Sequence, residues 1–163
     1  MKFMDIADAR MSVIGFGYVE LPLAVDLGRK YRTVGFDVKA ARIKEFQDGH
    51  DSTGEVETQE LCRSPHHIFA SDISVLADCN VCIVAVPTSI NSLHRTNPGP
   101  LILACETIAR VIPKGDVVIC HSTVYPGATE DDCSPVIERL TGLRCIGVGP
   151  YSLVYRVDCG GPY

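Results

Sequence analysis

Long apolar runs and an excess of positive charge are both missing from this sequence. No uninterrupted apolar stretch reaches the roughly 20 residues that span a bilayer, and residues 1–10 do not read as a signal peptide. The formal net charge of the 163-residue chain is −5, which disfavours a nucleic-acid partner because phosphate binding normally needs a basic face. We therefore expect no membrane and no nucleic acid among its partners, and a cytoplasmic location is the default expectation.

Metal-binding cysteine patterns are incomplete, although the chain contains eight cysteines. Cys79 and Cys82 form a CxxC pair, but the second pair and the histidine spacing of a zinc site are missing. Most cysteines stand in apolar runs or helix-like segments, where a free cysteine behaves as a small apolar residue. We expect buried or incidental free thiols and no metal site.

Apolar runs alternate with helical patterns along the chain, and this alternation predicts the fold. Hydrophobic residues make up 46% of the sequence, enough for the core of one domain. Runs typical of buried strands occupy residues 11–16, 33–36, 67–70, 81–86 and 117–120. Helical spacing occupies residues 18–30, 40–47, 101–112 and 128–140. These strand–helix units predict an α/β fold with a Rossmann-like, doubly wound, mainly parallel sheet and helices on both faces.

A glycine turn joins the first predicted strand to the first predicted helix. Gly15 permits a tight turn, and Gly17 lets the backbone approach a pyrophosphate at the amino end of the helix. Asp37 closes the second predicted strand, where its carboxylate can accept hydrogen bonds from ribose hydroxyls and repel a 2′-phosphate. The pattern predicts a dinucleotide site that favours NAD over NADP. A glycine turn with a solvated aspartate in another α/β fold is the alternative.

The third position of the glycine pattern holds Glu20 instead of glycine. A side chain there crowds the contact between helix and strand, and its negative charge opposes the pyrophosphate. We expect the fold to survive with Glu20 turned outward in the first helical turn, and we expect cofactor affinity to fall.

Five stretches resemble the UDP-glucose/GDP-mannose dehydrogenase family. They are GFGYVELPLAVDLG (15–28), VGFDVKAARI (34–43), GHDST (49–53), VPTSIN (86–91) and STVYPGATEDDC (122–133). Within the family, the chain looks like the bacterial UDP-N-acetylglucosamine and UDP-N-acetylmannosamine 6-dehydrogenases. The resemblance covers residues 8–142, and GYVxLPLA and STVYPGAT are far more specific than the glycines alone.

The resemblance implies an NAD-binding domain from an enzyme that oxidises the 6-hydroxyl of a UDP-sugar to a carboxylate. The family uses NAD and passes through a thioester on a cysteine. The implied cofactor contacts are Gly15, Gly17, Tyr18 and Val19 at the pyrophosphate, Asp37 with Arg42 nearby at the adenosine ribose, and Thr88 and Thr123 in the cleft. A hydroxyl that caps its own loop is the alternative for each threonine.

The predicted NAD-binding domain covers residues 1–142, and residues 143–163 form an atypical tail. Family members are much longer, so the resemblance implies a truncated chain, and exposed apolar surface then favours a homo-oligomer. The tail resembles the family's catalytic segment, in which Cys145 matches the nucleophile and Gly149 replaces an aspartate; a last sheet strand is the alternative.

Catalysis by Cys145 needs a lowered thiol pKa, a base and oxyanion stabilisation. No lysine lies near Cys145 in the sequence, and the assisting aspartate is absent. We expect no turnover from this chain alone. A non-catalytic nucleotide-binding module or a degenerate fragment is the alternative to an enzyme.

Overall fold

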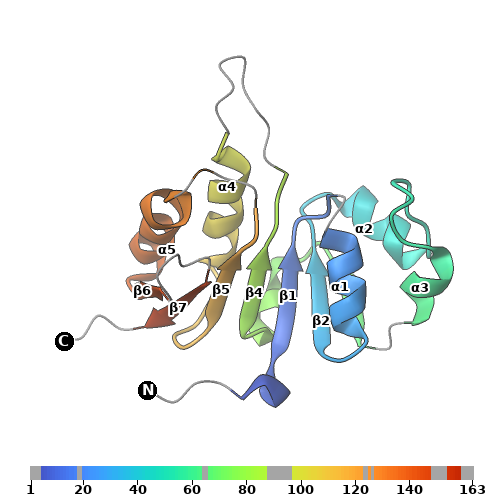
Figure 1. The fold of residues 1–163 in the computed structure, drawn as a ribbon, viewed down its shortest axis with the longest axis horizontal. Helices are drawn as coiled ribbons and strands as arrows, with labels where there is room; N and C mark the ends of the chain where they lie inside the picture. The colour runs from blue at the N-terminus through green and yellow to red at the C-terminus, as the bar shows by residue number, and fades with distance from the viewer. Residues whose placement is uncertain are drawn as a thin grey trace.

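The computed structural model describes residues 5–17, 20–63, 66–87, 97–122, 125, 127–147 and 154–158, with the backbone alone at 62–63 and 154–158. In this part of the chain, seven strands form one sheet in the order β3-β2-β1-β4-β5-β7-β6 (Figure 1). The parallel strands are β1 (Arg10–Ile14), β2 (Arg32–Phe36), β3 (His67–Ala70), β4 (Val81–Val84) and β5 (Val117–Cys120). The predicted Rossmann-like sheet is therefore confirmed.

Helices cover both faces of this sheet. The described helices are α1 (Glu20–Gly28), α2 (Ala40–Gln47), α3 (Thr58–Arg63), α4 (Gly99–Ile108) and α5 (Ser134–Thr141). Shorter turns are η1 (Ile6–Asp8), η2 (Ile73–Asp78) and the π-helical η3 (Thr129–Cys133), which leads into α5. The predicted helix at residues 128–140 is thus a π turn followed by an α-helix, and the short turns η1 and η2 were not predicted.

Two apolar cores lie on opposite faces of the sheet, because side chains alternate along each strand. Val13 of β1 packs with α1, α2 and α3, whereas its neighbour Ile14 packs with α4, α5 and η2. The strand β4 is buried at every position. This two-sided burial explains why its sequence is continuously apolar instead of alternating.

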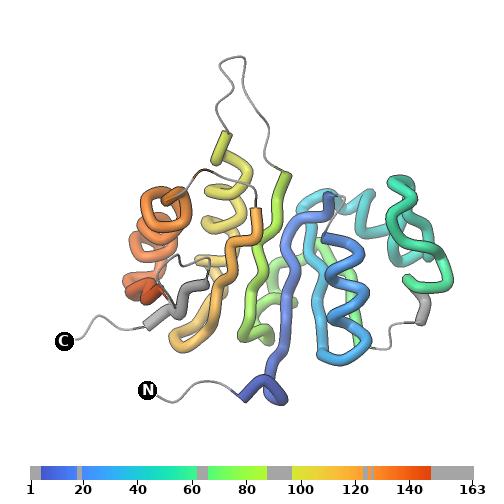
Figure 2. The backbone as a smooth tube through the Cα atoms, in the orientation of Figure 1, coloured from blue at the N-terminus to red at the C-terminus, as the bar shows by residue number. Residues whose placement is uncertain are grey.

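The order of the strands reverses between β1 and β4. From β1 the chain first builds β2 and β3 on one side, and it then crosses over to build β4 and β5 on the other (Figure 2). Loops leaving the carboxyl ends of β1 and β4 therefore diverge and leave a crevice between them. Open α/β sheets bind ligands at this kind of position.

The tail adds two strands at one edge of the sheet. The strand β7 (Val154–Asp158) runs antiparallel between β5 and β6 (Arg144–Gly147). The tail thus contains strands, as the alternative of a last sheet strand expected, but β6 pairs with β7 and not with β5. β7 was not expected from the sequence. Dividing the chain at residue 142 stays a prediction.

No helix in the described part of the chain is both long and apolar enough to cross a membrane.

Candidate dinucleotide site

A cavity of about 410 Å³ opens at the carboxyl ends of β1, β2 and β4 and is closed on one side by α4. Its lining includes the glycine turn, Asp37 and apolar side chains such as Val38, Val86 and Leu103. Ligand pockets are commonly apolar clefts of about 300–1,000 Å³ with few polar groups. The cavity has the size and composition to hold part of a nucleotide.

Gly15 makes the tight turn that follows β1. Its φ is 89°, a left-handed conformation that favours glycine. A Cβ atom at Gly15 would lie 2.7 Å from the carbonyl oxygen of Ala85 and 2.9 Å from Cγ1 of Val86. The N–H of Gly15 donates to the carbonyl oxygen of Phe36 at 2.9 Å. This backbone therefore lies against the ends of both β2 and β4, where no larger residue fits.

Asp37 lies directly beside this turn. Its Oδ2 accepts a hydrogen bond from the N–H of Phe16 at 2.9 Å, and its Oδ1 accepts one from the N–H of Lys39 at 2.8 Å. These two bonds fix the carboxylate in the cavity wall, and each oxygen keeps a lone pair for a ligand hydroxyl. The glycine turn and the carboxylate are thus neighbours, as the sequence predicted.

Glu20 folds inward, so the expectation that it turns outward is wrong. The residue is only 8% exposed. Its Oε2 lies 2.7 Å from the point that a Cβ of Gly17 would occupy. The reason is helical spacing, because Glu20, Ala24 and Gly28 follow one another at intervals of four along the buried stripe of α1. A carboxylate therefore stands over the glycine turn where the pattern places a pyrophosphate.

Arg42 is not among the described residues that line the cavity. Its guanidinium donates to Glu45 Oε2 at 2.7 Å and to Asp51 Oδ1 at 2.8 Å. The guanidinium carbon lies 4.4 Å from the centre of the Phe46 ring, over its face. The hydroxyl oxygens of Ser52 and Thr53 also accept hydrogen bonds from this guanidinium. The structure thus places Arg42 in a network that ties α2 to the loop at residues 51–53.

Tyr18, Val19, Thr88 and Thr123 lie outside the described residues. Ser122, which precedes Thr123, was not among the predicted site residues. Its Oγ accepts from the N–H of Val86 at 3.0 Å and lies 3.1 Å from the carbonyl oxygen of Val86. This contact joins the segments that follow β4 and β5. The STV signature of the resemblance already contained this serine.

Cys145 lies on β6, packed against α5 and away from the described cavity lining. Its N–H donates to Glu138 Oε1 at 2.9 Å, and its Sγ lies 3.9 Å from the carbonyl oxygen of Ser134. Burial and the charge of Glu138 raise the pKa of the Cys145 thiol to about 11. An activated nucleophile needs the opposite shift. The net shift of this pKa therefore runs against activation of Cys145 as a nucleophile.

A glycine turn in a left-handed conformation, a carboxylate fixed beside it and a cavity at the reversal of strand order define the class of a Rossmann-type dinucleotide-binding domain. Residues 9–150 match the NAD binding domain of the UDP-glucose/GDP-mannose dehydrogenase family, and the chain belongs to that family. The predicted family and its cofactor, NAD, are confirmed.

Individual relatives agree with this assignment. The chain is 49% identical, over 137 residues, to the UDP-N-acetyl-D-glucosamine 6-dehydrogenase of Pseudomonas aeruginosa, covering 84% of this chain and 32% of that protein. The structure of the UDP-D-ManNAc dehydrogenase of Pyrococcus horikoshii superposes with a TM-score of 0.74 at 31% identity, covering 83% of this chain and 33% of that one. The chain thus spans about a third of the length of the curated relatives it matches.

Proposed function

We propose that this chain binds NAD with its adenosine in the cavity and its diphosphate at the glycine turn, as the cofactor half of a UDP-sugar 6-dehydrogenase. The supporting observation is the hydrogen bond between the Asp37 carboxylate and the N–H of Phe16 in the glycine turn, because a carboxylate beside such a turn could accept hydrogen bonds from a ribose. The names of the relatives support a UDP-sugar as the substrate of the complete enzyme. Bound NAD would supply the hydride acceptor.

The walls of the cavity suit the adenosine. Val38 is 75% exposed and Leu103 is 63% exposed, although both are apolar and line the cavity. A flat purine lying between them would remove this apolar surface from water, which is a favourable change. Asp37 would accept hydrogen bonds from the ribose and repel a 2′-phosphate, which favours NAD over NADP.

Turnover requires groups beyond those that the described residues bring to the cavity. Cys145, the residue that resembles the family nucleophile, has a raised pKa and lies outside the described lining. We therefore propose that the chain binds NAD and has no dehydrogenase activity by itself. The exposed apolar side chains favour self-association. The family resemblance adds a role in polysaccharide synthesis, with the cytoplasm as the default location.

Glu20 provides the test, because its carboxylate stands over Gly17. The experiment is a calorimetric titration of the wild type, Glu20→Gly and Glu20→Gln with NAD. Removing the charge should tighten NAD binding about tenfold, equivalent to about 1.4 kcal/mol. The glutamine variant keeps the length of the side chain, so it separates the effect of charge from that of crowding.

Adenosine serves as the control ligand, because it lacks the diphosphate. Its affinity should be the same for all three proteins, with circular dichroism verifying that the glycine variant keeps its helix content. Failure of all three proteins to bind NAD would overturn the proposal. An equal gain for adenosine and NAD would overturn the placement of the diphosphate at the turn.

A further inference from the structure

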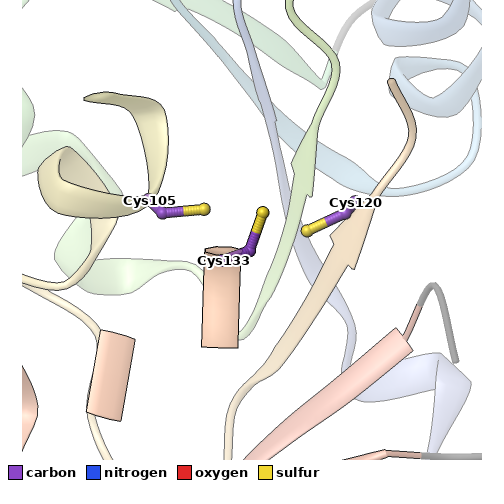
Figure 3. Close-up of side chains that lie close together, drawn as sticks. All are labelled: Cys105, Cys120 and Cys133. Carbon is purple, nitrogen blue, oxygen red and sulfur yellow. The ribbon is translucent and has the colours of Figure 1, made fainter. Parts of the chain in front are cut away.

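Three cysteine side chains from three separate elements point toward one another on the α4 face of the sheet (Figure 3). Cys105 lies on α4, Cys120 ends β5 and Cys133 ends η3. Their Sγ atoms all lie within 4.8 Å of one another. The three residues are 0%, 2% and 1% exposed. The fold thus gathers three sulfur atoms that stand far apart in the sequence.

The spacing of these sulfur atoms is close to that of a metal–thiolate site. A metal–sulfur bond is about 2.3 Å long, so three sulfurs around one ion in a plane are about 4 Å apart. The sulfurs need to approach by less than about 1 Å, which small side-chain rotations can provide. Cys120 is the last residue of β5 and Cys133 is the residue before α5, so both stand at the ends of their elements.

The ligand set favours a soft ion of low coordination number. Within the described residues, no further cysteine, histidine or carboxylate joins the group. Cys145 packs against the same core, but its sulfur stays outside the group. The surrounding core side chains are apolar, including Val84, Leu101, Ile108, Val118 and Ile137. Thiolates suit both Cu(I) and zinc, but a tetrahedral zinc ion would lack its fourth ligand among the described residues, so three sulfurs favour Cu(I).

We propose that Cys105, Cys120 and Cys133 form a buried three-thiolate binding site for Cu(I). Each thiol that binds loses its proton to solvent as the copper–sulfur bond forms, and copper enters and stays as Cu(I), so no electron is transferred.

The site is independent of the glycine turn, because it lies between α4, β5 and η3. Cys105 nevertheless follows Ala104 on α4, and Ala104 lines the cavity. Bound Cu(I) would therefore hold one wall of the cavity against β5.

The test titrates the reduced, full chain with Cu(I) under anaerobic conditions, with bicinchoninate as a competing chelator. We expect one equivalent of Cu(I) per chain and an increase in the thermal midpoint, because an ion that binds only the folded state stabilises it. The amount of Cu(I) bound per chain should fall well below one equivalent in each of the variants Cys105→Ala, Cys120→Ala and Cys133→Ala. Cys82→Ala is the matched control, because Cys82 is equally buried but outside the group.

X-ray absorption of the copper-loaded wild type decides the question even where a variant fails to fold. The proposal requires three sulfur neighbours at about 2.3 Å. It is overturned by two-sulfur coordination, by loss of copper to the chelator, or by equal binding in all the cysteine variants. Zn(II) that displaces Cu(I) in a parallel titration would overturn the choice of ion.

Discussion

The carboxylate of Asp37 accepts a hydrogen bond from the backbone N–H of Phe16 at 2.9 Å, across 21 positions of sequence. Phe16 lies within the glycine turn after β1, and Asp37 directly follows β2. The bond therefore joins the two parts of the candidate NAD site into one unit. Each part is positioned by the end of a buried parallel strand, so the geometry of the site depends on the register between β1 and β2.

Asp37→Asn should weaken NAD binding about tenfold or more, because a charged acceptor of ribose hydroxyls is replaced by a neutral amide. NADP binding should fall less, since the repulsion of its 2′-phosphate is removed as well. Calorimetric titration with both nucleotides measures the change in preference. Asp72→Asn is the matched control, because Asp72 also accepts from a backbone N–H, that of Ser74, but lies outside the described cavity lining. An equal loss of affinity for NAD and for NADP would contradict the role of Asp37 in discriminating between the two nucleotides.

Gly15→Ala should lower the free energy of unfolding by at least about 2 kcal/mol, because it combines a left-handed φ with a backbone clash. Gly54→Ala is the comparison, since Gly54 has a φ of 71° but nothing within 4 Å of an added Cβ. That variant should lose only about 1 kcal/mol. Urea unfolding measures both values. Equal losses would show that the close approach to Ala85 does not matter.

Asp51→Asn should destabilise the protein at neutral pH by about 2–4 kcal/mol, because it leaves the nearly buried Arg42 without its buried partner. Burial raises the pKa of Asp51, but hydrogen bonds from Thr53, Arg42 and Val56 outweigh it and lower the pKa from 3.8 to about 2. A depressed pKa contributes stability that is fully present above about pH 4 and is lost as the pH falls toward 2.

Urea unfolding of the wild type and Asp51→Asn at pH 7 and pH 2.5 tests this prediction. The difference between the two proteins should shrink at the lower pH. Glu45→Gln is the control, because Glu45 also binds Arg42 but its side chain is 36% exposed. The substitution Glu45→Gln should lower the free energy of unfolding by less than about 1 kcal/mol. A difference that is independent of pH would argue against an ionised Asp51 as the stabilising group.

Asp116→Asn should stabilise the protein at pH 7 by about 1–3 kcal/mol. Asp116 is 7% exposed, and its Oδ2 has no hydrogen-bond partner among the described residues. Burial raises the pKa of this carboxyl from 3.8 to about 6. The folded state therefore binds the proton more tightly than the unfolded state, so wild-type stability falls as the pH rises from about 4 to 6.

The measurement for Asp116 is urea unfolding of wild type and variant across pH 3.5 to 7.5. The two curves should approach each other toward pH 3.5, where the carboxyl is protonated in the folded state and mostly protonated in the unfolded state. A stabilisation by Asp116→Asn that is the same at every pH would point to altered packing instead of removal of a buried charge.

Most of the parallel sheet was predictable from local patterns. The helix Ala40–Gln47 and the strands at residues 67–70 and 117–120 have the expected boundaries, because apolar spacing alone determines them. The tail was less predictable. β7 enters between β5 and β6 by long-range antiparallel pairing, and no local pattern encodes the choice of a neighbouring strand.

The sequence by itself determined the fold class, the family, and the glycine turn paired with Asp37, because each depends on residue types at fixed spacings along the chain. Only the tertiary structure decided the direction of Glu20, the partners of Arg42 and the meeting of Cys105, Cys120 and Cys133. These three features depend on how helices pack against the sheet and on which loops approach each other. Such contacts join residues from separate elements, and their spacing in the sequence carries no signal of them.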